Sequence, residues 1–376
     1  MLEQLFGVPF TLASFLVALT VVVFVHEFGH FWVARRNGVR CQAFSIGFGP
    51  ELFGYTDKLG TRWKFSLIPL GGYVKMFGEA ETMQAVEGGK EGEAKSEFRE
   101  LTPEEKLVSF KHKTVGQRAA IAVAGPAVNF LFAIVVFWFT FMSVGRPITE
   151  PVIGTVQEGS AAAAAGLAPE DRVLSIDGTK VERFEDIRGV IQLSTGAPLD
   201  VVIRRRTEEL TLSVAPRQSV TKDTFGNETK VFLLGITSSG ETRYKDLNPA
   251  TALGEAVDQT YQIVRGTTVA LGQIVAGTRG TEDLGGPIRI AKYSGQAAQS
   301  GVAGFIIFMA ILSLNLGFIN LFPVPLLDGG HLLFYAIEAV RKRPLSERAQ
   351  EWGLRVGLAL VLALMVFVTW NDIVHF

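Results

Sequence analysis

The amino-acid sequence predicts a polytopic α-helical membrane protein with four transmembrane helices, a membrane-associated β-hairpin or small sheet, and one inserted α+β domain. Three observations support this prediction. The 376 residues are 48% hydrophobic and have a mean hydropathy of +0.28, which is high for a soluble protein. Four apolar runs approach the length of about 20 residues that a helix needs to cross a bilayer. Between these runs lie segments in which apolar and polar residues alternate, as they do in strands.

The four apolar runs cover 5–33, 119–144, 302–322 and 356–370, and the last is the shortest. The first is not expected to be a cleaved signal peptide, because residues 1–10 contain no Lys or Arg and the run ends in His-Glu. The expected organisation is a first transmembrane helix (1–34), a cytoplasmic segment with the sheet and a polar linker (35–118), a second transmembrane helix (119–144), the inserted domain (145–240), an amphipathic connecting segment (241–301), a third transmembrane helix (302–335), a cytoplasmic loop (336–355) and a fourth transmembrane helix (356–376).

The positions of Lys and Arg predict how the chain is oriented, whereas the net charge of −1 predicts nothing about partners. Neither residue precedes the first run or follows the fourth. By the positive-inside rule, 35–118 and 341–355 are cytoplasmic, and both termini and the segment 145–301 lie on the periplasmic side of a bacterial inner membrane. The single cysteine, Cys41, can form no internal disulfide. The basic residues that set this orientation are Arg35, Arg36, Arg40, Lys111, Lys113, Arg118, Arg341, Lys342, Arg343, Arg348 and Arg355.

Alternating segments at 44–49 and 62–76 predict a hairpin or small sheet after the first helix. Its many apolar side chains indicate that it dips against the membrane. An open edge of such a sheet could accept a substrate segment as an added strand, and the alternative is that the sheet only packs under the helices. The polar run 79–100 is expected to be a solvated linker. Helical spacing of apolar residues over 248–274 predicts an amphipathic helix, lying either on the outer membrane surface or against the inserted domain.

The inserted domain resembles a PDZ domain of the bacterial protease type. The resemblance rests on Gly166-Leu-Ala-Pro-Glu-Asp171 followed by Asp177-Gly178. Glu170 stands where that pattern has glycine, so the local turn is open to question. PDZ domains bind extended peptides by strand addition, and 152–156 is the candidate segment for this role. The alternative is a steric gate that has no affinity for peptides.

His26-Glu27-Phe28-Gly29-His30 ends the first apolar run. Histidines four residues apart share one face of a helix, so both imidazoles can bind one Zn²⁺ while Glu27 stands beside it as a candidate catalytic base. The alternative is a pair of histidines that hydrogen-bond to neighbouring helices, although ionisable residues are costly in hydrocarbon and are usually functional there.

A catalytic zinc ion usually has a third protein ligand and one open position. Asp328 is the best candidate, because it follows Pro323 and Pro325, which break the third helix and free backbone to line a polar cavity. His331 is the rival ligand. Glu338 is expected to be solvated, and no metal role is expected for the two remaining histidines, His112 and His375.

These motifs together resemble the site-2 protease family of intramembrane zinc metalloproteases, most closely its bacterial regulator-of-sigma-E members. The resemblance spans nearly the whole chain. It implies that His26, His30 and Asp328 bind zinc, that Glu27 is the catalytic base, that Asn315 and Asn320 contact an unwound substrate, and that the sheet engages this substrate. Asn129, Gly47 and Gly49 are further candidate substrate-binding residues, with interhelical hydrogen bonding as the alternative role of Asn129. The motifs are His26–His30, 44–49, 67–75, 125–129, the PDZ stretch and 315–330.

The predicted function is therefore an intramembrane zinc endopeptidase that makes the second cut in a single-span substrate. The family suggests an anti-sigma factor as the substrate, and signal-peptide remnants as others; no nucleic-acid partner is expected. One alternative is a metal transporter, which should carry ionisable residues along several helices, whereas the first run has none before His26. Another is a PDZ-containing scaffold without proteolytic activity, against which the presence of Glu27 argues, because zinc binding does not require it.

Overall fold

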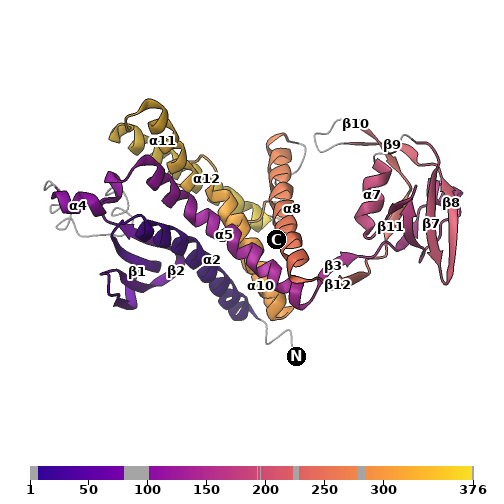
Figure 1. Ribbon diagram of the computed structural model, residues 1–376, viewed down its shortest axis with the longest axis horizontal. Helices are drawn as coiled ribbons and strands as arrows, with labels where there is room; N and C mark the ends of the chain where they lie inside the picture. The colour runs from indigo at the N-terminus through magenta and orange to yellow at the C-terminus, as the bar shows by residue number, and fades with distance from the viewer. Residues whose placement is uncertain are drawn as a thin grey trace. The chain divides into compact units, whose positions relative to one another are not determined.

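The computed structural model describes residues 7–79, 101–192, 194, 196–222, 228–277, 281 and 284–374. The chain forms two compact units (Figure 1). The helical unit comprises Met1–Phe137, Glu255–Gly266 and Thr281–Phe376, and the β-rich unit comprises Trp138–Gly254 and Thr267–Gly280. Apart from Glu79, the expected linker over 79–100 lies outside the described residues.

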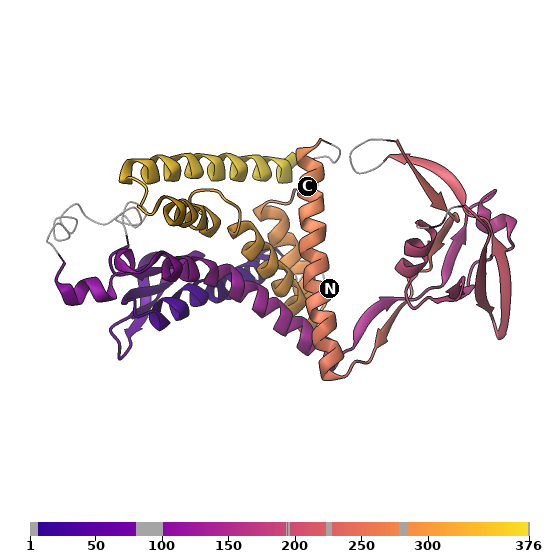
Figure 2. The ribbon, with the colours of Figure 1, turned by 45° about the horizontal axis from the view of Figure 1, so that its top comes forward.

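Among the described residues, four helices are long and apolar enough to cross a membrane, which confirms the prediction of four candidate spans. Their most apolar windows have mean hydropathies of 2.1 to 2.5. The last of them, at the edge of the helical unit in Figure 2, leaves most of its apolar side chains exposed, as contact with lipid requires. The four helices are α2 (Val8–Arg36), α5 (Val115–Ser143), α10 (Val302–Asn320) and α12 (Glu347–Val374).

The expected third transmembrane segment, 302–335, contains two helices, separated by the helix break that Pro323 and Pro325 predict. Helix α10 ends at Asn320, and α11 (Asp328–Arg341) begins after the seven intervening residues 321–327. Pro323 and Pro325 cannot donate the backbone hydrogen bonds that would continue α10. The expected loop over 336–355 therefore starts with the last turns of α11.

The predicted sheet is present, and its two long strands pair more extensively than a simple hairpin. Strand β1 (Cys41–Thr56) and strand β2 (Arg62–Met76) are antiparallel. Phe44 pairs with Val74 on one side and with Trp63 on the other, and Trp63 pairs in turn with Tyr55. Each strand therefore folds back on itself, and the result is four adjacent strand segments in the order 51–56, 62–66, 43–46 and 72–76.

Aromatic contacts hold this sheet against α2. The Phe31 ring lies 5.5 Å from Phe44 and 5.0 Å from Trp63, measured between centroids. At the turn of the hairpin, Asp57 accepts hydrogen bonds from Arg35 at 2.6 Å and from Trp63 at 3.1 Å. Burial acts to raise the pKa of Asp57, but these bonds and two from backbone N–H groups outweigh it and lower the pKa to about 2.

The β-rich unit contains a core of small and β-branched side chains that includes Ile153, Ile176 and Val201, each fully buried. Its central sheet has the strand order β6-β5-β7-β8. The elements are β4 (Ile153–Val156), α6 (Ala161–Ala164), β5 (Arg172–Ile176), β6 (Thr179–Lys180), α7 (Phe184–Gln192), β7 (Leu199–Arg205), β8 (Glu208–Val214), β9 (Arg217–Lys222), β10 (Glu228–Leu233) and β11 (Ile236–Ser238), with β4 paired to β11 and β9 to β10.

The turn at Glu170 adopts the conformation that a glycine would adopt. Glu170 has a φ of 70°, in the left-handed region that favours glycine. The next residue holds the turn in place: Asp171 is fully buried, accepts a hydrogen bond from the Ala168 N–H at 2.8 Å, and pairs with both Nε and Nη2 of Arg205 at 2.8 Å. Glu170 departs from the PDZ sequence pattern, and its backbone takes the conformation in which glycine is favoured.

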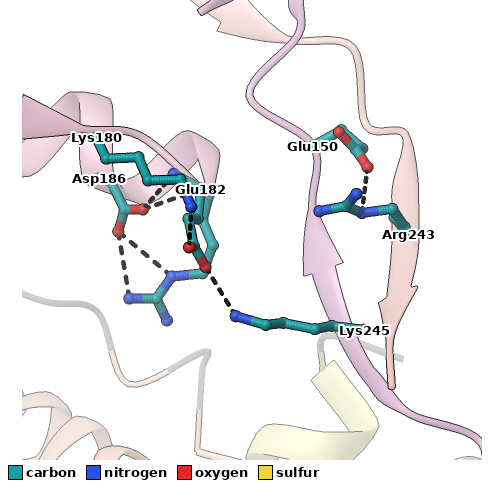
Figure 3. A network of polar contacts seen from close by, with 7 residues as sticks. Glu150, Lys180, Glu182, Asp186, Arg243 and Lys245 are labelled. Atoms are coloured by element: carbon teal, nitrogen blue, oxygen red, sulfur yellow. Dashed lines mark hydrogen bonds and ion pairs between the residues drawn. The ribbon is translucent and has the colours of Figure 1, made fainter. Parts of the chain in front are cut away.

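A two-stranded ribbon of β3 (Arg146–Thr149) and β12 (Thr242–Lys245) leads into the β-rich unit. Ion pairs join it to the central sheet: Lys245 and Lys180 both contact Glu182, at 2.8 and 2.9 Å (Figure 3). The two lysines lower the pKa of Glu182 to about 2. Beside them, the buried Glu150 pairs with Arg243 of the ribbon at 2.9 Å.

Two helices follow the ribbon along the chain before α10. The predicted helix over 248–274 is confirmed as α8 (Pro249–Val275), and Asn248 caps it by accepting the Thr251 N–H at 2.9 Å. Helix α9 (Pro287–Gln299) was not predicted. Its N-terminus is capped by the fully buried Asp372 of α12, which accepts hydrogen bonds from the N–H groups of Gly286, Ile288 and Arg289 at 2.9 to 3.1 Å. The last element, α4 (Pro103–Val108), precedes α5 with a single 3₁₀ turn between them.

Candidate metal centre

His26 and His30 lie one helical turn apart on α2, as their spacing predicts, and both are buried. Their Nε2 atoms are 3.2 Å from each other. His30 donates its Nδ1–H to the carbonyl oxygen of Ile121 on α5 at 2.8 Å. A carbonyl can only accept, so the proton of a neutral His30 lies on Nδ1 and the lone pair of Nε2 points at His26.

Asp328 reaches the same point from the break between α10 and α11. Its Oδ2 atom lies 3.2 Å from Nε2 of His26 and 3.4 Å from Nε2 of His30. This oxygen is buried, yet no hydrogen bond is formed to it. A buried, unpaired carboxylate oxygen facing two imidazole nitrogens indicates that a cation belongs between them.

The donor set fits a zinc ion. Ligands that bind a tetrahedral zinc ion at about 2.0–2.1 Å are separated from one another by about 3.3–3.4 Å. The three separations here are 3.2, 3.2 and 3.4 Å. Two imidazoles and one carboxylate also match the ligand types of catalytic zinc sites, which keep one position open. Among the described residues, His26, His30 and Asp328 are the group whose atoms are placed to hold a metal ion.

Two glycines let α5 approach α2 closely enough to build this site. A Cβ at Gly29 would overlap the carbonyl oxygen of Ala124, and a Cβ at Gly125 would overlap Nε2 of His30. The Gly125 position would also place a Cβ 2.9 Å from Cε1 of His26. Figure 1 shows the resulting close passage of α2 and α5. Small residues have the same use at other helix crossings in membranes.

Glu27 lies on α2 between the two histidines and faces the sheet. A Cβ at Gly72 would be 3.2 Å from Cγ of Glu27, so the strand segment 72–76 passes directly beside this side chain. Within the sheet, the segment 72–76 pairs along one edge with residues 43–46 of β1. A carboxylate next to the metal ligands and next to a strand is in a position to serve as a general base for a peptide bound there.

The rival candidates lie elsewhere. His331 belongs to no metal-binding group among the described residues, and its ring lies 6.4 Å from those of Phe334 and Tyr335. The expectation that Glu338 is solvated was wrong: Arg118 pairs with it at 2.6 Å, and 15% of its side chain is exposed. His112 contacts Ser109, and His375 lies outside the described residues.

The predicted substrate-binding residues occupy three different environments. Asn315 and Asn320 are half-buried on α10, and Asn320 donates to the Leu316 carbonyl at 3.0 Å. Asn129 is fully buried on α5, with its amide 3.2 Å from Nδ1 of His26. Gly47 and Gly49 have φ values of 88° and 85° and form the bend of β1. Their roles toward a substrate stay predictions.

Comparison with known proteins places the chain in a family. The model of peptidase family M50 matches residues 14–364. This chain belongs to peptidase family M50. Among its M50 relatives is an Agrobacterium fabrum protein described as a candidate zinc metalloprotease, 45% identical over 96% of this chain and 95% of that protein. Metalloprotease MmpA of Caulobacter vibrioides is 37% identical over 98% of this chain and 96% of its own length.

The regulator of sigma-E protease RseP of Escherichia coli is another M50 relative, 34% identical over 96% of this chain and 98% of RseP. That alignment runs over 461 positions, more than the 376 residues of this chain, so RseP contains segments that this M50 peptidase lacks. A solved PDZ domain of the SdrC-like protein from Listeria monocytogenes covers 24% of this chain and 87% of that structure, at 16% identity and a TM-score of 0.20. At this score the likeness carries no argument.

Sequence reasoning missed how the M50 site is supported. The histidine pair is positioned by Gly29, Gly125 and the carbonyl oxygen of Ile121. The identity of these residues alone does not predict these contacts. The one available signal was Gly125-Pro-Ala-Val-Asn129 on the second span, which contributed to the family resemblance. The structure explains the motif: Gly125 leaves space for the imidazoles of His26 and His30, and Asn129 contacts His26.

Proposed function

We propose that this protein is an intramembrane zinc endopeptidase, with His26, His30 and Asp328 as the zinc ligands and Glu27 as the general base. One observation carries the proposal: three buried donor atoms, one of them an unpaired carboxylate oxygen, lie at the spacing of tetrahedral zinc ligands. Two of them belong to a helix that is apolar enough to span a membrane. The names of the relatives, zinc metalloprotease and regulator of sigma-E protease, agree with it.

A zinc ion in this site supplies Lewis acidity for the attack of water on a peptide carbonyl carbon. The residues of the chain do the rest. The Glu27 carboxylate takes a proton from the attacking water as the C–O bond forms, and it then delivers this proton to the amide nitrogen as the C–N bond breaks. The surrounding apolar helices limit access of bulk water to the reacting groups.

A transmembrane substrate must unwind before it can be cut, because a helix hides its amide groups in hydrogen bonds. We propose that the strand segment 72–76 receives the unwound substrate as an added strand. This segment passes beside Glu27 and pairs with β1 along one edge, so the substrate would add to its other edge. Asn315 and Asn320 on α10 are then candidates for holding freed backbone groups, and Gly47 and Gly49 shape the sheet that binds it.

We further propose that the β-rich unit is a PDZ domain, with β4 as its peptide-binding strand and the turn at Glu170 and Asp171 as the pattern that identifies it. By the positive-inside rule this unit and both termini face the periplasm, and 35–118 faces the cytoplasm. The substrates are single-span membrane proteins that have lost most of their outer domain, such as an anti-sigma factor, and signal-peptide remnants.

The test is cleavage of a tagged single-span substrate in detergent by the wild-type protein, Glu27→Gln and Asp328→Asn, with bound zinc measured for each. Glu27→Gln should keep zinc and lose at least about a hundredfold in rate, whereas Asp328→Asn should lose both. His112→Ala is the matched control and should behave as wild type, because His112 contacts Ser109 away from the site. A Glu27→Gln variant that cuts at the wild-type rate would refute the assignment of the base.

A further inference from the structure

We infer that Asn129 is a positioning residue of the metal site: its side-chain oxygen accepts the Nδ1–H of His26 and thereby turns the lone pair of His26 Nε2 toward the metal. The inference rests on the proposed zinc function. It also changes the expected role of Asn129, which the sequence suggested as a substrate contact.

Burial and an unpaired oxygen atom single out this side chain. Asn129 is fully buried on α5, 103 residues from His26 in sequence. Its Nδ2 lies 3.2 Å from Nδ1 of His26, whereas its Oδ1 is buried and accepts no hydrogen bond. The Asn129 amide can either donate a hydrogen bond to Nδ1 of His26 or accept one from it, and its Oδ1 lacks a partner.

The two orientations of the amide have opposite consequences for the metal. With Nδ2 donating, Nδ1 of a neutral His26 must be the acceptor, so its proton sits on Nε2 and blocks metal binding there. The oxygen and nitrogen ends of an asparagine amide are nearly the same size, so the turned amide occupies the same space. Turned, it gives Oδ1 the donor that it lacks and leaves Nε2 of His26 free to bind.

The other histidine shows the same arrangement. His30 donates Nδ1–H to the Ile121 carbonyl at 2.8 Å, which leaves its Nε2 unprotonated. With Asn129 turned, both imidazoles donate through Nδ1 to an oxygen of α5 and both present Nε2 to Asp328. Histidines that bind metals commonly donate their second N–H to such an acceptor, which fixes the tautomer and the ring orientation.

Helix α10 packs against Asn129. Ser313 donates its hydroxyl to the backbone oxygen of Asn129 at 3.2 Å. A Cβ at Gly317 would lie 3.0 Å from Cβ of Asn129, so α10 leaves the side chain little room to move away from His26. Ser313 thus contacts the same residue without touching its amide, which makes it the matched control.

The experiment measures zinc affinity of the purified full-length protein in detergent, by competition with a chromogenic chelator, for Asn129→Asp, Asn129→Leu and Ser313→Ala. Asp keeps an acceptor of the same shape but cannot donate when ionised, whereas Leu has neither group. We expect Asn129→Asp to bind zinc within a few-fold of wild type, Asn129→Leu to bind about 10–100-fold more weakly, and Ser313→Ala to match wild type. Thermal unfolding of each apoprotein confirms that it is folded, and Asn129→Ala replaces the Leu variant if that one does not fold.

Three results would overturn the inference. Wild-type zinc affinity in Asn129→Leu would show that the amide does not position His26. Equal weakening in folded Asp and Leu variants would show that His26 needs a donor instead. Unchanged zinc affinity with a raised KM for a single-span substrate would make Asn129 a substrate contact. By contrast, wild-type zinc affinity in His26→Ala would refute the proposed zinc site itself, which distinguishes the two failures.

Discussion

At Gly125 the space that a side chain would occupy is filled by the imidazoles of His26 and His30. A Cβ there would overlap Nε2 of His30 and lie 2.9 Å from Cε1 of His26. The backbone of α5 cannot retreat freely, because Ile121 of the same helix holds Nδ1 of His30. A single methyl group at this position must therefore displace the ligands.

We predict that Gly125→Ala lowers zinc affinity by about tenfold or more and reduces cleavage in proportion, because it separates the three donor atoms. Equilibrium zinc binding and cleavage of a single-span substrate measure the two effects. Gly116→Ala is the control on the same helix, since a Cβ at Gly116 meets no atom within 4 Å. Equal zinc affinity in the two variants would contradict the prediction.

At the scale of elements, the break between α10 and α11 depends on α12. A Cβ at Gly357 of α12 would overlap the carbonyl oxygen of Pro325, and one at Gly353 would lie 2.9 Å from Cζ of Phe334. These two glycines, four residues apart, let α12 pack directly on the segment that carries Asp328. Leu326 in that segment has a φ of 103°, which is strained for a residue other than glycine.

We predict that Gly357→Ala moves Pro325 and, with it, Asp328, so that zinc affinity falls although Gly357 itself does not contact the ligands. Zinc affinity and the temperature of unfolding should both fall. Gly266→Ala in α8 serves as the control, because a Cβ at Gly266 meets no atom within 4 Å. If Gly357→Ala binds zinc as tightly as Gly266→Ala, then α12 does not position Asp328.

Elements fixed by local pattern could be predicted, and those fixed by distant contacts could not. The four spans and the pair His26 and His30 follow from hydropathy and spacing within one segment. Asp328 could be chosen because prolines mark the helix break beside it. The capping of α9 by Asp372 was beyond prediction, because it joins positions more than 80 residues apart. The double pairing of β1 was missed because it depends on bends at Gly47 and Gly49.

At the scale of the whole molecule, the distribution of basic residues predicts which parts face the cytoplasm. In a Cys41→Ser background, Lys111→Cys and Glu158→Cys place single thiols at exposed positions on the segments expected inside and outside. In spheroplasts, a membrane-impermeant maleimide should label the thiol at 158 and reach the thiol at 111 only after lysis. Labelling of position 111 in intact spheroplasts would reverse the proposed orientation.

The histidine pair lies off-centre along α2, much closer to the end of the helix than to its start. At about 1.5 Å per residue, His26 lies about 27 Å from the start of the helix at Val8, whereas His30 lies about 9 Å from its end at Arg36. A bond cut at this level divides a spanning segment unequally. Under the proposed function, a cut at this level would leave the shorter piece with few apolar residues, so that it could dissolve in the adjacent aqueous phase while the longer piece stayed anchored in the lipid. The cut would then decide which part of the substrate leaves the membrane.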